Sequence, residues 1–143
     1  MSSTVERVTV TDAALELLRQ LQREHGPVMF HQSGGCCDGS APMCFPQGDF
    51  IVGDHDRLLG HIGGAPFYIS GPQFEYWQHT HLTIDVVPGR GGMFSLEGPT
   101  GQRFLTRSRL YADEEWAWLE INQPNGPPSG AAAPQDAAAR NSV

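Results

Sequence analysis

Residues 8–26, with the sequence VTVTDAALELLRQLQREHG, decide the fold of this chain. Residues 5–10 alternate valine with polar residues, which predicts a short strand. Thr11 or Asp12 then offers a side-chain oxygen that can cap the first turn of a helix. The next apolar residues recur at spacings of three and four and share one helix face: Ala13, Ala14, Leu17, Leu18 and Leu21. The helix is expected to end by Gly26, which Pro27 follows.

Shorter patterns predict the rest of the domain. They indicate strands at 28–32, 50–52, 67–70 and 81–87, a helical turn at 73–78, a hairpin of 93–97 with 102–108, and a helix at 112–122. The acidic first turn of the last helix suits the helix dipole. The sequence therefore predicts a single α+β domain over residues 1–122, with a mostly antiparallel sheet and a helix near each end.

The last residues differ in composition from this domain. Residues 123–143 are rich in alanine, proline, glycine and small polar residues. Such a segment buries too little apolar surface to offset its loss of conformational entropy on folding. We expect it to be disordered unless it docks on a partner.

Composition and charge exclude several classes of function. The chain has 143 residues, nine basic against sixteen acidic, and a net charge of −7. This acidic balance argues against a nucleic acid partner, because phosphate binding draws on clustered basic residues. All nine basic residues are arginine, so no lysine can bind a phosphate in a P-loop or form a Schiff base. There is no apolar run of 18 residues and no apolar signal-peptide core at the start, and a cytoplasmic location is expected.

A glycine-rich segment holds the strongest candidate site. Within fourteen residues it contains one imidazole and three thiols, from His31, Cys36, Cys37 and Cys44. Imidazole and thiolate are the usual protein ligands of zinc and iron, so these four residues are the candidate metal ligands. The spacing is not that of a zinc knuckle, and adjacent cysteines rarely bind one ion together without strain. A redox or thiol-reactive site and purely structural cysteines remain alternatives.

Two further groups of polar residues have weaker signals. His79 and His81 lie two apart at a predicted strand and could face one ligand, although outward polar residues are the commoner reason for this pattern. The other group has no regular spacing and is interpreted as a surface loop: Asp54, His55, Asp56 and His61.

Three arginines are predicted to lie on one face of the last strand. Arg103, Arg107 and Arg109 all have odd numbers, and alternate residues of a strand project from the same side. Such a face could bind the carboxylates of a partner protein. The structural alternative, which we favour, is pairing with the acidic first turn of the closing helix, residues 113–115.

Signals for catalysis are few. Cys36 or Cys37 could act as a nucleophile with His31 as the base, which keeps a thiol-dependent enzyme as an alternative. A cation or a helix N-terminus that would lower the pKa of the thiol is not evident beside them. The sequence has no nucleophile-elbow serine, dinucleotide-binding glycine motif or paired-carboxylate motif.

Several strings of residues resemble those of an uncharacterised bacterial family, a domain of unknown function. They are SGGCCDGS at 33–40 with Pro42 and Cys44, IDV at 84–86, FLTRSR at 104–109 and DEE at 113–115. Genes of that family commonly lie beside those of aldehyde dehydrogenases. The resemblance therefore implies a non-enzymatic accessory or adaptor protein whose partner is an aldehyde or alcohol dehydrogenase.

A more distant likeness concerns the fold. Residues 8–14, 34–36, 84–85 and 92–94 are similar to segments of the A-type iron–sulfur carriers, which have the HesB-like fold. The resemblance implies that fold and a zinc, iron or iron–sulfur binding module as the alternative function. Only Cys36 matches a ligand position of those carriers. They end with a Cys-x-Cys pair, whereas this chain has no cysteine after Cys44.

Overall fold

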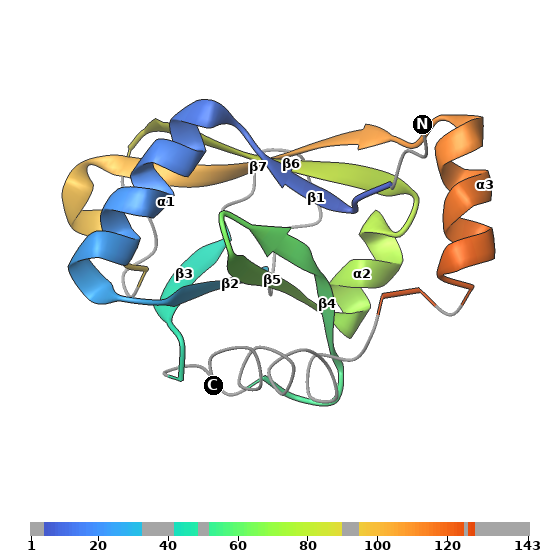
Figure 1. The fold of residues 1–143 in the computed structure, drawn as a ribbon, viewed down its shortest axis with the longest axis horizontal. Coiled ribbons are helices and arrows are strands. Elements are labelled where there is room, and N and C mark those ends of the chain that lie inside the picture. The colour runs from blue at the N-terminus through green and yellow to red at the C-terminus, as the bar shows by residue number, and fades with distance from the viewer. Residues whose placement is uncertain (1–4, 33–41, 49–51, 90–94, 125, 128–143) are drawn as a thin grey trace.

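The computed structural model describes residues 5–32, 42–48, 52–89, 95–124 and 126–127. In chain order the elements are β1 (Val8–Val10), α1 (Asp12–His25), β2 (Val28–Gln32), β3 (Met43–Pro46), β4 (Asp56–Ile62), β5 (Ala65–Ser70), α2 (Gly71–Trp77), β6 (Thr80–Pro88), the 3-10 turn η1 (Gly98–Thr100), β7 (Gln102–Leu110) and α3 (Asp113–Asn122). Figure 1 shows a three-stranded sheet above a four-stranded one, with α1 at one side and α2 and α3 at the other.

Both sheets are mixed. The first has the strand order β1-β6-β7 and the second has the order β3-β2-β5-β4. Each contains one parallel pairing, β1 with β6 and β2 with β5, and the other pairings are antiparallel. The α+β class is thus confirmed, whereas two mixed sheets replace the one mostly antiparallel sheet that the sequence predicted. The predicted HesB-like arrangement is not confirmed.

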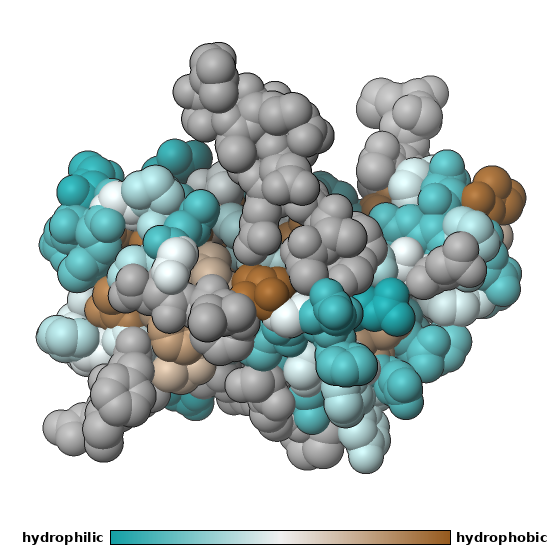
Figure 2. Space-filling model, turned by 90° about the horizontal axis from the view of Figure 1, so that it is seen from below, coloured by the Kyte–Doolittle hydropathy of each residue, from teal (hydrophilic) through white to brown (hydrophobic). Residues whose placement is uncertain are grey.

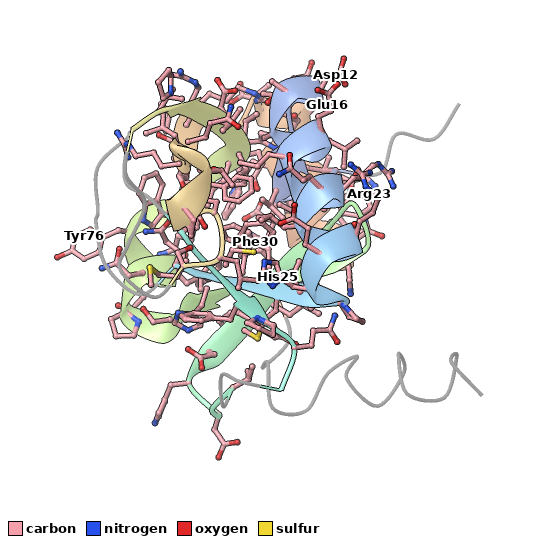
Figure 3. The ribbon with its side chains drawn as sticks, turned by 90° about the vertical axis from the view of Figure 1, so that its left-hand side faces the viewer. Asp12, Glu16, Arg23, His25, Phe30 and Tyr76 are labelled. Atoms are coloured by element: carbon pink, nitrogen blue, oxygen red, sulfur yellow. The ribbon has the colours of Figure 1, made fainter. Side chains whose placement is uncertain are left out.

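The main core lies between the two sheets and α1. Phe30 is fully buried and stacks on Phe67, with ring centroids 5.8 Å apart, while the edge of Phe104 meets it at 5.0 Å. Figure 3 shows Phe30 in this interior and Tyr76 pointing away from it. From α1, the core receives the buried side chains of Ala14, Leu17, Leu18 and Leu21. This burial accounts for the helical spacing of apolar residues in the sequence.

The start and end of α1 follow the sequence prediction. The Thr11 hydroxyl accepts a hydrogen bond from the Ala14 amide at 3.2 Å and donates one to Asp85 Oδ1 at 3.0 Å. This side chain therefore caps the helix and also ties it to β6. The helix ends at His25, and Gly26 takes the positive φ of 80° that glycine adopts at little cost.

Two sequence predictions were wrong. Residues 56–62 form β4 and are not a surface loop. The sequence does not show this strand because a bulge between Leu58 and Gly60 interrupts the alternation that marks a strand. Strand β7 pairs with β6 along its whole length, and the predicted hairpin with residues 95–97 is not present. Residues 95–97 form a bend and turn ahead of η1. The predicted strand at 50–52 lies mostly outside the described residues.

The chain after α3 returns along the domain. The backbone carbonyl of Pro127 accepts a hydrogen bond from Arg57 at 3.0 Å, and Gly126 lies against the ring of Phe74. Residues 128–143 of the predicted tail lie outside the described residues. Among the described helices, none has the length and apolar character needed to cross a membrane.

Candidate functional site

The four-stranded sheet positions two of the predicted metal ligands. Strands β2 and β3 are antiparallel neighbours in which Phe30 lies opposite Cys44 and His31 lies opposite Met43. Because successive strand residues project from opposite faces, Cys44 joins Phe30 in the main core and His31 faces the outer side. The structure therefore does not bring His31 and Cys44 together. Cys36 and Cys37 lie outside the described residues.

His31 instead meets a carboxylate. Its Nε2 lies 2.7 Å from Oδ1 of Asp56, and the two side chains are 4% and 14% exposed. The second carboxylate oxygen of Asp56 accepts a hydrogen bond from the Gly53 amide at 2.8 Å, which fixes its orientation. Sequence reasoning missed Asp56 as a site residue because it assigned this residue to a surface loop.

An apolar cluster surrounds the His31–Asp56 pair on the outer face of the sheet. Met29, Leu58 and Tyr68 are buried there, and the register places Tyr68 directly opposite both His31 and Leu58. Figure 2 views the molecule from this side and shows hydrophobic residues among grey ones near its centre. Burial in apolar surroundings strengthens the electrostatic interaction between an imidazole and a carboxylate.

A histidine held by a carboxylate can serve two kinds of chemistry. The carboxylate fixes the tautomer and ring orientation, as is usual for a metal-binding histidine and for a general base. The described residues contain no cluster of three or more histidine, cysteine, aspartate or glutamate side chains that could hold a metal. A metal held by His31 would therefore need at least one ligand from outside the described residues.

Cys44 lies in a separate buried cluster. Its backbone N–H donates to the Ser95 hydroxyl at 2.8 Å, and that hydroxyl in turn donates to the fully buried carboxyl of Glu97. Burial and the nearby Glu97 carboxylate raise the pKa of the Cys44 thiol well above its usual range. Burial also raises the pKa of Glu97. A raised pKa favours the neutral thiol, which is a poor metal ligand and a poor nucleophile.

The two histidines at the start of β6 do not converge on a ligand. His81 is buried, and its ring nitrogens lie 2.8 Å from the Thr9 hydroxyl and 2.9 Å from the Glu6 carbonyl oxygen. Burial lowers the pKa of His81. His79 lies in the turn just before β6 and is exposed. Its ring packs against Trp116, with ring centroids 4.5 Å apart. Both histidines therefore have structural partners.

Comparison with known protein families identifies the family of this chain. Residues 17–110 match the family described as "Domain of unknown function (DUF779)". The chain belongs to this family. The match runs from α1 through β7 and so includes His31, Cys44 and Asp56. No curated protein matches the sequence.

Strand β7, which carries the three predicted arginines, is the last element of the DUF779 match. The pairing of β6 with β7 places Arg103, Arg107 and Arg109 on one face, as predicted. Arg107 Nε donates to Asp85 at 2.8 Å, and Arg109 forms two hydrogen bonds of 2.8 and 2.9 Å with Glu115. The favoured alternative, pairing with the first turn of the closing helix, is confirmed for Arg109. The partner of Arg107 lies on β6 and was not predicted.

These pairs leave the arginines accessible. The side chains of Arg107 and Arg109 are 50% and 54% exposed. The contact with Arg109 lowers the pKa of Glu115 to about 2. The three arginines and their two acidic partners define what we call the arginine face, which comprises Asp85, Arg103, Arg107, Arg109 and Glu115.

Proposed function

We propose that the protein is a non-enzymatic accessory protein that binds an aldehyde or alcohol dehydrogenase through the arginine face. The resemblance to a family encoded beside aldehyde dehydrogenases supports this partner. A cytoplasmic location is part of the same proposal.

The geometry of the arginine face carries the proposal. Arg107 and Arg109 are ordered by internal carboxylates yet remain half exposed. An arginine fork that is already oriented loses little side-chain entropy when a second carboxylate binds. Surface ion pairs contribute little to stability, at most about 1 kcal/mol. Acidic side chains on a partner could therefore add to these pairs or displace Asp85 and Glu115.

Co-purification tests the proposal. The full chain, tagged and expressed with the dehydrogenase encoded beside it, should retain that enzyme and change its activity. The variant Arg103→Gln/Arg107→Gln/Arg109→Gln should retain much less of it. The control is Arg19→Gln/Arg23→Gln, which removes two exposed arginines from α1. Absence of any complex and of any activity change would refute the accessory role. Equal losses in both variants would refute the arginine face as the contact.

The His31–Asp56 pair favours a second candidate function. In it, the chain is a zinc, iron or iron–sulfur binding module with a HesB-like fold, and His31 and the cysteines Cys36 and Cys37 supply ligands. The aspartate suits this role because second-shell carboxylates orient metal-binding imidazoles. A bound metal would supply Lewis-acid or electron-transfer chemistry. The opposite orientation of Cys44 removes that residue from the set that could act with His31.

Elemental analysis of anaerobically purified protein tests the metal module. Near-stoichiometric zinc or iron is expected, with clearly lower occupancy in Asp56→Asn and unchanged occupancy in Cys44→Ala. Less than about a tenth of an equivalent of either metal in the unaltered chain would refute this candidate.

The same pair also bears on the third alternative, a thiol-dependent enzyme. Asp56 would orient His31 as the base for Cys36 or Cys37. Selective alkylation of one of these cysteines at neutral pH, slowed in His31→Gln, is expected. Uniformly slow labelling of both would contradict this alternative.

A further inference from the structure

Residues of α2 and α3 line a cleft together with Arg7, which precedes β1. Figure 1 shows α2 and α3 at the same end of the molecule. The volume of the cleft is about 530 Å³, which lies within the range of small-molecule sites. The residues that matter for its chemistry are Arg7, Phe74, Trp116, Leu119, Glu120 and Gln123. None of them belongs to the arginine face or to the His31–Asp56 pair.

Arg7 is a buried cation in the wall of this cleft. The residue is only 5% exposed. Its Nε donates to Gln123 Oε1 at 2.8 Å, its Nη1 donates to the Gln78 carbonyl at 3.3 Å, and its guanidinium lies 5.3 Å from the centre of the Phe74 ring. Tyr111 also interacts with the guanidinium, and burial raises the pKa of its phenol to about 12, so all four partners are neutral. Among the described residues, no carboxylate oxygen lies within 4 Å of the Arg7 guanidinium.

This arrangement is the reverse of the one on the arginine face. Arg107 and Arg109 are half exposed and yet each has a carboxylate within 3 Å. Arg7 is much more buried and therefore has more to gain from an opposite charge. Burial lowers the pKa of Arg7, although an arginine remains protonated at physiological pH. A buried guanidinium on an open cleft is a favourable place for an anion.

The other walls indicate the rest of the ligand. Phe74, Trp116 and Leu119 provide apolar surface, and Trp116 is held in place by its contact with His79. Gln123 adds an amide beside the guanidinium. Glu120 lines the same cleft and would repel a second negative charge. The guanidinium of Arg57 lies 5.9 Å from the centre of the Phe74 ring, but Arg57 does not line the cleft. One positive group, apolar walls and one negative group in the lining together suit a singly charged ligand with an apolar body.

We propose that this cleft binds a monocarboxylate with an apolar, preferably aromatic, body. The carboxylate accepts hydrogen bonds from the Arg7 guanidinium, and the body lies against Phe74 and Trp116. Nε and Nη1 of Arg7 each already donate one hydrogen bond within the protein, so the carboxylate accepts from the remaining N–H groups of the guanidinium. A dianionic phosphate binds less well, because it lacks an apolar body and faces Glu120.

Titration of the full chain with benzoate, benzyl alcohol and inorganic phosphate tests the site. The readout is the set of tryptophan indole N–H signals in NMR spectra, where Trp77 and Trp118 serve as internal controls. Benzoate should shift the Trp116 signal in a saturable way and bind at least about ten-fold more tightly than benzyl alcohol. This comparison needs no variant and is unaffected by folding defects.

Two variants then assign the charge. Arg7→Met should weaken benzoate binding about ten-fold or more, whereas Glu120→Gln should strengthen it, and Arg19→Met on α1 should leave it unchanged. Failure of benzoate to shift Trp116, equal binding of benzyl alcohol, or tighter binding of phosphate would overturn the proposal. A loss of binding in Arg19→Met equal to that in Arg7→Met would also overturn it. These outcomes are independent of whether a dehydrogenase binds.

Discussion

Nε2 of His31 and Oδ1 of Asp56 lie 2.7 Å apart, although 25 residues separate them in the sequence. His31 is on β2 and Asp56 is on β4, and strand β5 lies between these two strands in the sheet. The contact therefore spans the middle strand on the outer face. It makes the pair both a candidate functional group and a tie between non-adjacent strands.

Replacing Asp56 tests the structural part of this interpretation. Asp56→Ala removes the partner of a buried imidazole and the acceptor of the Gly53 amide. We expect the free energy of unfolding to fall by about 1–3 kcal/mol, measured by urea denaturation. Glu16→Gln, on the exposed side of α1 (Figure 3), is the control and should stay within about 0.5 kcal/mol. Equal stability of the two variants would show that the pair contributes nothing to folding.

Glu97 should make stability depend on pH. Burial raises its pKa above the ordinary value of 4.5, so the folded state binds the proton more tightly than the unfolded state. The contribution of Glu97 to stability is therefore greatest near or below pH 4.5 and is lost as the pH rises through the folded-state pKa. The stability of Glu97→Gln relative to the unaltered protein should increase between about pH 5 and pH 8. Thermal or urea unfolding of both proteins at the two pH values measures this difference, and a constant difference would contradict the prediction.

Cys44 should be chemically protected in the folded protein. Its side chain is fully buried and its thiol is held neutral, so iodoacetamide at neutral pH should leave it unmodified. Mass spectrometry after a timed reaction measures the modification. The same reaction in concentrated urea is the control and should label Cys44 rapidly. Fast labelling of Cys44 without denaturant would mean that the cluster with Ser95 and Glu97 opens readily.

The cap of α1 should contribute measurably to stability. Thr11→Ala removes the hydroxyl that contacts both Ala14 and Asp85. A loss of about 1–2 kcal/mol is expected from urea denaturation, because a helix cap and a hydrogen bond to a charged group are lost together. Thr11→Ser keeps the hydroxyl and should lose much less. Similar losses in the two variants would assign the effect to the methyl group instead of the cap.

Local signals account for the parts of the fold that the sequence predicted correctly. The apolar spacing of α1, its cap at Thr11 and the alternation along β6 are all properties of neighbouring residues. The bulge at Leu58 and Gly60 breaks such a pattern, and β4 was therefore missed. The parallel pairing of β1 with β6 joins residues about seventy positions apart, and no local pattern encodes it.

The candidate site shows the same division between local and distant information. The shared face of Arg103, Arg107 and Arg109 follows from strand alternation and was predicted. The partner of His31 depends on the strand order β2-β5-β4, which single-sequence patterns do not specify. The separation of His31 from Cys44 depends on the register of β2 with β3. The charge of Arg7 is visible in the sequence, but its burial in a cleft is not.

The accessory role is tested most directly by isothermal titration calorimetry of the full chain into the purified dehydrogenase encoded beside it, at about 0.15 M salt. Saturable binding with a Kd in the micromolar range or tighter is expected. The Arg103→Gln/Arg107→Gln/Arg109→Gln variant should bind about ten-fold or more weakly, and Arg19→Gln/Arg23→Gln should bind like the unaltered chain. No detectable binding by the unaltered chain, or equal binding by the arginine-face variant, would contradict the account.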